Sequence, residues 1–346
     1  MKKILFFAED PGAANYLSAL YTILKNDFVI HFFAINTAYD FLIQQGYNIK
    51  KYEKDKIKNL DIDLFLFGTT SAKEKKWEVI FKFLKKKNVR TIGAIDAIIS
   101  SDFRFLDENL LPDYIIVPDK EILDEYRPKL LNCKFILSGH LQWEEILKNR
   151  EKLHSKRKKF QNKYFSNLEK DSKKIFFISE PPPPIENKYF PENFVGNGDT
   201  NERTNICFQE IKKVLDKLNI SYHLIYKLHP KDDLNNYKKF KSMVYEFVLD
   251  TSENFGRMIA SDLVIGMTSN LLFQSFLLGI PTISVSLSSR EKNLIPCIIR
   301  DQLTSVSNSK QLENEMIYNL SQYKFNNTKI KLDSDTSKLK SLLMSL

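Results

Sequence analysis

Short apolar runs alternate with amphipathic segments along the whole chain. This alternation is typical of parallel βαβ units. In the first part of the chain, helices are predicted from Ala13 onward and over Ala38–Gln45. The predicted strands of this part are Ile4–Ala8, Phe28–Ala34, Leu64–Phe67, Arg90–Ala94, Tyr114–Val117 and Lys134–Leu137. We therefore expect a doubly wound α/β sheet of about six strands.

A second series of strands follows a long, highly charged segment that runs from Trp143 to Lys174 and is predicted to be helical. The predicted strands of this part are Lys174–Ser179, Tyr222–Lys227, Leu263–Gly266, Thr282–Val285 and Ser305–Ser307. The pattern predicts a first domain over residues 1–145, a charged helical linker over 146–172 and a second domain over 173–330. Residues 331–346 are predicted to form a C-terminal helix that can pack back on the first domain.

The composition is that of a folded globular protein. Of the 346 residues, 43% are hydrophobic and 27% are charged, which supplies enough apolar material for a core. No apolar stretch approaches the roughly 20 residues that span a bilayer, and the run Ile4–Ala8 is too short for a signal peptide. We expect a cytoplasmic protein. Cys133, Cys207 and Cys297 lie far apart and are predicted to be buried reduced thiols.

The net charge of +9 favours anionic partners such as nucleotides, acidic glycans or the inner face of a membrane. No nucleic-acid-binding signature is present, so we expect no nucleic acid partner. Neither a dinucleotide-binding fingerprint nor a P-loop occurs. The histidines show no zinc spacing, and the triplets Asp61–Asp63 and Asp333–Asp335 do not follow strands. We therefore expect no bound metal.

The segment Tyr226–Asp233 carries the first candidate chemistry. Alternate residues of a strand share a side, so Lys227 and His229 are predicted to lie on one face at its carboxyl end, where Pro230 stops the strand. A cation and an imidazole there can bind a nucleotide phosphate and stabilise it as it leaves. The alternative is a histidine that caps the strand or bonds to a nearby carbonyl.

The segment Asp262–Thr282 carries the second group of candidate functional residues. A buried strand runs into Thr268, Ser269 and Asn270, and an apolar helix follows. Ser269 is a candidate N-cap, which leaves backbone N–H groups and the positive end of the helix dipole for an anion. The alternative is an ordinary capped core helix.

Together these two segments resemble the C-terminal lobe of GT-B glycosyltransferases. They are most similar to the His-Pro and Ser/Thr-Ser motifs of bacterial sialyltransferases, polysialyltransferases and Kdo transferases, and similar elements occur in CDP-glycerol glycerophosphotransferases. The resemblance implies a GT-B fold, with two Rossmann-like domains facing across a cleft. It also implies a CMP-activated sugar as donor. Phe177–Pro181 stands at the first strand-to-loop turn of such a donor lobe and adds Ser179 and Glu180 to the predicted donor site.

The first domain is similar to the acceptor lobe of GT-B enzymes over Asp113–Asp119 and Phe135–Leu141. Ile95–Asp96 with Asp102–Phe105 resembles a segment of surface-polysaccharide transferases. The acidic motif of the sialyltransferases is absent. The predicted catalytic base is Asp10, with Glu9 and Asp96 as alternatives; a helix N-cap is the other interpretation of Asp10. Gly12 and Asn15 are placed in an acceptor-side loop beside it.

The expected function is metal-independent transfer of a sugar, a CMP-linked nonulosonate or Kdo, to a hydroxyl of a surface glycan, lipid-linked saccharide or glycoprotein. On this expectation CMP stabilises the fold more than UDP or GDP does, and the basic surface can contact the membrane face. Three alternatives remain open. They are a CDP-glycerol glycerophosphotransferase-like enzyme, a UDP-sugar 2-epimerase-like enzyme, and an inactive glycan- or nucleotide-binding protein.

Overall fold

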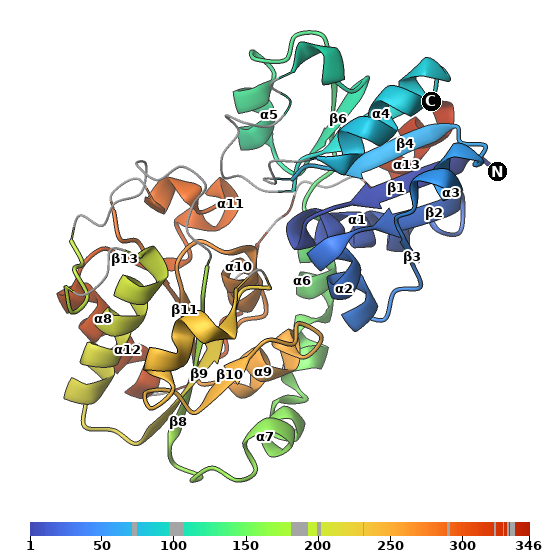
Figure 1. Ribbon diagram of the computed structural model, residues 1–346. Helices are drawn as coiled ribbons and strands as arrows, with labels where there is room; N and C mark the ends of the chain where they lie inside the picture. The colour runs from blue at the N-terminus through green and yellow to red at the C-terminus, as the bar shows by residue number, and fades with distance from the viewer. Residues whose placement is uncertain are drawn as a thin grey trace. The chain divides into compact units, whose positions relative to one another are not determined.

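The computed structural model describes the chain except residues 71–74, 97–104, 106, 181–192, 199–201, 231, 289–290, 322, 328, 331 and 333–335. The chain divides into two compact units. Unit 1 comprises Met1–Glu144 with Leu332–Leu346, and unit 2 comprises Glu145–Lys331. In Figure 1, unit 1 runs from blue to teal and includes the red C-terminal helix, while unit 2 runs from green to orange-red.

Unit 1 is built on a seven-stranded parallel sheet with the order β3-β2-β1-β4-β5-β6-β7. Its strands are β1 (Lys3–Ala8), β2 (Val29–Ala34), β3 (Lys50–Lys51), β4 (Leu64–Gly68), β5 (Arg90–Ala94), β6 (Tyr114–Val117) and β7 (Lys134–Leu137). Its helices are α1 (Pro11–Leu24), α2 (Asn36–Gln44), α3 (Lys54–Lys58), α4 (Lys76–Lys86), η2 (Glu108–Leu110), α5 (Lys120–Tyr126) and α13 (Thr336–Ser345).

Both faces of this sheet are buried, which is why its strands read as apolar runs. Ile4 and Phe6 of β1 belong to one hydrophobic cluster, whereas Leu5 and Phe7 belong to the cluster on the opposite face. The first cluster also contains Leu339 and Leu343 of α13. The C-terminal helix is therefore part of the core of unit 1.

Unit 2 contains a six-stranded parallel sheet with the order β10-β9-β8-β11-β12-β13. Its strands are β8 (Lys173–Ile178), β9 (Tyr222–Lys227), β10 (Glu246–Val248), β11 (Leu263–Gly266), β12 (Thr282–Val285) and β13 (Thr304–Val306). Its helices are α7 (Arg157–Phe165), α8 (Arg203–Lys217), η3 (Leu234–Phe240), α9 (Asn254–Ala260), α10 (Asn270–Leu277), η4 (Glu291–Leu294), α11 (Cys297–Arg300) and α12 (Ser309–Ser321). Helix α6 (Leu141–His154) begins in unit 1 and continues in unit 2.

The predicted α/β fold with two doubly wound parallel sheets is confirmed, and every predicted strand is present within one residue at each end. Each sheet gains a short edge strand that the pattern did not predict, β3 and β10. Cys133 and Cys207 are buried as predicted, but Cys297 is exposed at the start of α11. None of the helices in the described part of the chain has the length and apolarity needed to cross a bilayer.

The segment 146–172, predicted as a charged helical linker, is helical over most of its length. Most of it forms α6 and α7, and α7 packs on α9 within unit 2. Arg157 fixes α7 there, because its guanidinium donates to Oδ1 of Asp262 at 2.7 Å and to the carbonyl of Ser261 at 2.5 Å. These bonds make α7 part of unit 2.

Each sheet has one point at which the chain direction across the sheet reverses. In unit 1 the reversal lies between β1 and β4, and in unit 2 it lies between β8 and β11. Open α/β sheets bind ligands outside the carboxyl ends of the strands at such points. The residues that follow these four strands are therefore the first places to look for a site.

Candidate functional site

The carboxyl edge of the unit 2 sheet brings three predicted segments together. Strand β8 lies between β9 and β11, so the residues after these strands are neighbours. The hydroxyl of Ser179, after β8, accepts a hydrogen bond from the backbone N–H of His229 at 2.9 Å and donates to Oδ2 of Asp232 at 3.0 Å. Asp232 Oδ2 also accepts from the His229 N–H at 3.0 Å. These bonds hold the half-buried His229 and Pro230 in a tight turn at the edge.

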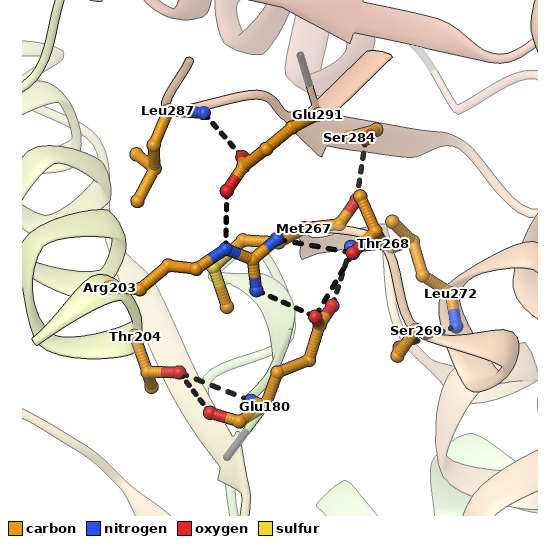
Figure 2. Close-up of polar contacts among 10 residues, drawn as sticks. All are labelled: Glu180, Arg203, Thr204, Met267, Thr268, Ser269, Leu272, Ser284, Leu287 and Glu291. Atoms are coloured by element: carbon orange, nitrogen blue, oxygen red, sulfur yellow. Dashed lines mark hydrogen bonds and ion pairs between the residues drawn. The ribbon is translucent and has the colours of Figure 1, made fainter. Parts of the chain in front are cut away.

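A buried ionic network lies under the turn between β11 and α10 (Figure 2). Arg203, at the start of α8, donates from Nε to Glu291 at 2.5 Å and from NH1 to Glu180 at 2.7 Å. Its NH2 donates to the hydroxyl of Thr268 at 3.1 Å. All three nitrogens of the guanidinium thus donate hydrogen bonds inside unit 2.

The charges in this network are mutually compensated. Burial alone lowers the pKa of Arg203, but the charges of Glu180 and Glu291 outweigh it and raise the pKa, so the guanidinium stays charged. Burial raises the pKa of Glu291, and Arg203 offsets part of that rise. Glu291 also accepts the backbone N–H of Leu287 at 2.7 Å.

The network changes the interpretation of two predicted donor-binding residues. Glu180 accepts the backbone N–H of Thr268 at 2.5 Å and the Thr268 hydroxyl at 3.1 Å. Because both polar hydrogens of Thr268 point at Glu180, these two side chains shape the turn rather than offering groups to a ligand. The carbonyl of Met267 is held as well, by the hydroxyl of Ser284 at 2.6 Å.

Helix α10 begins directly after this fixed turn. The Ser269 hydroxyl accepts the backbone N–H of Leu272 at 3.2 Å, so the predicted N-cap is confirmed. Asn270 is the first helical residue, and the cap takes up the N–H of Leu272, two residues further on. With the positive end of the dipole, this start is suited to an anion.

Lys227 has a different environment from the one predicted. Its side chain is 2% exposed, and its Nζ donates to the carbonyls of Leu228 at 2.7 Å and Leu249 at 3.1 Å. Burial lowers the pKa of Lys227 to about 8. The alternation along the strand placed Lys227 correctly at the end of β9, but its ammonium group bonds to the backbone inside unit 2.

In unit 1, Asp10 stands at the reversal point between β1 and β4. Its Oδ2 accepts the hydroxyl of Thr70, which follows β4, at 2.8 Å. Asp10 occupies the N-cap position of α1, but its side chain makes no cap hydrogen bond, and Pro11 follows. The geometry therefore does not favour the helix-cap interpretation, and a role as base stays a prediction.

Glu9 is 4% exposed and lies at the start of α4. Its carboxylate accepts the backbone N–H groups of Trp77 at 2.7 Å and Lys76 at 3.0 Å. Burial raises the pKa of Glu9, and the two N–H bonds oppose that rise. Glu9 thus caps a helix, which leaves Asp10 and Asp96 as the stronger candidates for a base.

Asp96 lies beside the start of α1, and Asn15 is a residue of this helix. A Cβ on Gly12 would overlap Oδ2 of Asp96, so only glycine allows this carboxylate to lie against the helix backbone. Gly12 and Asn15 are in the first turns of α1 rather than in a loop. Asn15 and Gln142 exchange amide hydrogen bonds of 2.7 and 2.5 Å.

Sequence reasoning missed Arg203 and Glu291, because nothing near either residue signals that they meet across 88 positions. The segments that contain Asp119 and His140 were identified from the sequence, but no role was predicted for these two residues. Asp102 to Arg104, Pro181 and the triplet Asp333–Asp335 lie outside the described residues. Within the described ranges, no group of three or more His, Cys, Asp or Glu side chains is placed to hold a metal ion.

Comparisons with known proteins give structural matches only, since no family model and no curated protein sequence matches the chain. The UDP-N-acetylglucosamine 2-epimerase from Rickettsia bellii has a TM-score of 0.64 at 10% identity, covering 100% of this chain and 96% of that one. The UDP-GlcNAc 2-epimerase from Neisseria meningitidis bound to UDP-GlcNAc has a TM-score of 0.62 at 11% identity, covering 99% and 98%. The wall teichoic acid polymerase TagF, as its H444N variant, has a TM-score of 0.52 at 13% identity, covering 99% and 88%.

The fold is of the GT-B type. The matches extend over essentially the whole chain and agree with the two parallel sheets of units 1 and 2. At identities of 10–13% they show the fold alone. They do not support the resemblance to sialyltransferases and Kdo transferases.

Proposed function

We propose that this protein is an enzyme that acts on a nucleotide-activated donor. We further propose that unit 2 binds this donor through its nucleoside diphosphate. The observation that carries the proposal is the arrangement at the carboxyl edge of the unit 2 sheet: the Ser179 hydroxyl holds the backbone N–H of His229, and Glu180 holds Thr268, directly before the capped start of α10. One structural neighbour is described as bound to UDP-GlcNAc, another as a UDP co-structure, and a TagF structure as soaked with CDPG. All three descriptions support a nucleotide ligand for this fold.

In the proposed reaction, the activated group passes to a hydroxyl of a glycan, lipid-linked or protein acceptor. Negative charge develops on the departing diphosphate, and a preorganised anion site lowers the cost of that charge. We assign this stabilisation to the N–H groups at the start of α10, with Ser269 and Asn270, and to the imidazole of His229. We propose that no divalent ion is required, because the helix start and His229 supply the compensating charge.

A diphosphate donor replaces the CMP-linked donor that the sequence resemblance implied. The neighbours named with a ligand carry UDP, UDP-GlcNAc or CDPG, and none of these is a CMP-linked sugar. A sugar or a polyol phosphate linked to UDP or CDP is therefore the donor class that we favour.

A second candidate is 2-epimerisation of a UDP-sugar. The TM-scores of the two epimerases, 0.62 and 0.64, are higher than the 0.52 of TagF, and the epimerases match the chain over more of their own length. Epimerisation needs several acid–base groups around one sugar. Glu9, which caps α4, is already committed elsewhere.

Product analysis separates the two reactions. The purified protein is incubated in D2O with UDP-GlcNAc and, separately, with CDP-glycerol, each with and without a mixture of glycan acceptors. Transfer predicts release of UDP or CDP that depends on the acceptor and leaves unreacted donor free of deuterium. Incorporation of deuterium into the sugar of intact UDP-GlcNAc would establish the epimerase instead. Neither product with any donor would contradict the proposed function.

A further inference from the structure

A buried lysine lies at the carboxyl edge of the unit 2 sheet, where the neighbouring strands β9 and β10 end (Figure 1). Lys227 is the last residue of β9, and its Nζ donates to the carbonyl of Leu228 at 2.7 Å. The same Nζ donates to the carbonyl of Leu249, just after β10, at 3.1 Å. The backbone N–H of Leu228 also bonds to the carbonyl of Val248 in β10 at 3.0 Å. The ammonium therefore joins the two strand ends directly before His229.

The lysine acts on the orientation of His229 through one peptide group. The carbonyl of Leu228 and the N–H of His229 belong to the same planar peptide unit. Lys227 holds the oxygen of this unit, while the Ser179 hydroxyl and Oδ2 of Asp232 accept its N–H at 2.9 and 3.0 Å. The peptide plane that leads into His229 is thus fixed from both sides, and loss of the lysine frees one of them.

The ammonium brings a positive charge with which no carboxylate among the described residues makes an ion pair. Burial lowers the pKa of Lys227 to about 8, the charges of Asp250 after β10 and of Asp232 oppose this fall, and Arg257 of α9 adds to it. Tyr237 of η3 makes a side-chain hydrogen bond with Asp232, and burial raises the pKa of this tyrosine, so it stays neutral. At neutral pH, Lys227 is therefore a charged group in surroundings that disfavour charge, and an anion bound nearby would stabilise it.

The proposed diphosphate site lies within the range of this charge. His229 is two residues from Lys227, and the start of α10 follows β11, which is two strands from β9. Neighbouring strands are about 4.8 Å apart, so the helix start is roughly 10 Å across the sheet from the end of β9. At that distance and an effective dielectric constant of about 20, one positive charge strengthens the binding of one negative charge by roughly tenfold.

We propose that Lys227 is a positioning residue of the nucleotide site, which orients the turn of His229 and attracts the diphosphate without touching it. This inference rests on the proposed donor site in unit 2. Contact with the ligand stays with His229, Ser269 and Asn270. A buried lysine without an ion pair lowers the stability of the fold at neutral pH, and on this proposal the gain is affinity for an anion.

The two effects of Lys227 respond differently to pH. Above pH 8 the ammonium becomes an amine. The amine still has two hydrogens for the carbonyls of Leu228 and Leu249, so the turn stays in place while the charge is lost. A bound diphosphate favours the charged form and raises the pKa of Lys227. Nucleotide affinity should therefore fall by about tenfold between pH 7 and 10, and binding near pH 8.5 should take up protons from solution.

The test measures UDP and CDP binding by titration calorimetry from pH 7 to 10, in paired buffers whose different ionisation enthalpies reveal the protons taken up. Lys227→Met is compared with the wild-type protein and with Lys174→Met as the control. Lys174 is also buried, at 8% exposed, and its Nζ also donates to backbone carbonyls, including those of Glu169 and Lys170 at 3.2 Å. It lies near the start of β8, at the opposite edge of the same sheet. Lys174→Met thus removes the same kind of bonds away from the nucleotide site.

We expect the wild-type protein and Lys174→Met to lose about tenfold in affinity between pH 7 and 10, and to take up about half a proton per nucleotide at pH 8.5. Lys227→Met should bind about tenfold or more weakly at pH 7, because it lacks both the charge and the bonds, and it should lack this fall and this proton uptake. Ionisation of the nucleotide itself is common to the three proteins and cancels in their comparison. The pH profile of the wild-type protein tests the charge even if Lys227→Met does not fold.

A wild-type affinity that stays the same from pH 7 to 10 would overturn the role of Lys227 and leave the donor site intact. Equal affinities of Lys227→Met and the wild-type protein at pH 7 would do the same. An equal loss of affinity in Lys174→Met would show a general effect of destabilisation and would also overturn it. If the wild-type protein binds neither nucleotide at pH 7, the proposed donor site is wrong and the role of Lys227 is overturned with it.

Discussion

Replacing Arg203 with methionine should destabilise unit 2 strongly. The guanidinium is 8% exposed and bonds to two carboxylates, of which Glu291 is fully buried and Glu180 is 11% exposed. Methionine keeps most of the side-chain volume but removes the charge and the bonds to Glu180, Glu291 and Thr268. Two buried carboxylates are then left without a cation.

The expected cost follows from the burial of these partners. Removing one member of a buried ion pair costs about 3–5 kcal/mol, because the remaining charge is left uncompensated. For a unit of this size, each kcal/mol lowers Tm by roughly 2–4 °C, so the unit 2 transition should fall by about 6–20 °C at pH 7.5.

The loss of stability in Arg203→Met should also depend on pH. Burial raises the folded-state pKa of Glu291, and without Arg203 nothing offsets that rise above the unfolded value of about 4.3. A folded-state pKa above the unfolded one means that the folded variant takes up protons more readily. The difference from the wild-type protein is therefore largest near pH 8 and narrows as the pH falls toward 5.

Differential scanning calorimetry of Arg203→Met from pH 5 to 8 measures both effects. Lys163→Met is the matched control, since it breaks the exposed pair of Lys163 with Glu253 and should change Tm little. Arg203→Met combined with Glu180→Gln and Glu291→Gln should recover much of the stability, because no charged side chain then remains in this network. A variant that melts within about 2 °C of the wild-type protein at every pH would refute the reasoning.

Two further predictions concern Lys227 and divalent ions. The pKa of Lys227 is about 8 in the folded state and 10.5 when unperturbed, so the unfolded chain binds the proton more tightly. This difference should raise the free energy of unfolding by roughly 3 kcal/mol between pH 7 and 11. In urea titrations, Lys227→Met should remove that contribution to the dependence of the unfolding free energy on pH. Donor consumption should be unchanged in EDTA; activity lost in EDTA and restored by Mg²⁺ or Mn²⁺ would contradict the metal-independent mechanism.

Most of the fold is predictable because its strands are buried on both faces. Strand β1, for example, divides its residues between two hydrophobic clusters and appears in the sequence as an unbroken apolar run. The edge strands β3 and β10 were missed for the opposite reason. Lys50–Lys51 is exposed, and Glu246–Val248 is only three residues long, so neither carries an apolar pattern.

The candidate site was predicted where a local pattern fixes a position, and missed where distant segments meet. Ser269 was identified as an N-cap because a small polar residue precedes an apolar helix. Strand alternation predicts that Lys227 and His229 lie on the same side of the strand. It does not predict whether that side faces solvent, so the burial of the Lys227 side chain was missed. Arg203 was missed because its carboxylate partners, Glu180 and Glu291, lie 23 and 88 positions away along the chain.

Nucleotide binding tests the central claim most directly. UDP, CDP and CMP are titrated into the wild-type protein and into His229→Ala by calorimetry. UDP or CDP should bind at least tenfold more tightly than CMP. A hydrogen bond to a charged group contributes about 1.5–3 kcal/mol, so His229→Ala should weaken the preferred diphosphate by roughly 10–150-fold. Binding of none of the three, or tighter binding of CMP than of both diphosphates, would contradict a nucleoside diphosphate site in unit 2.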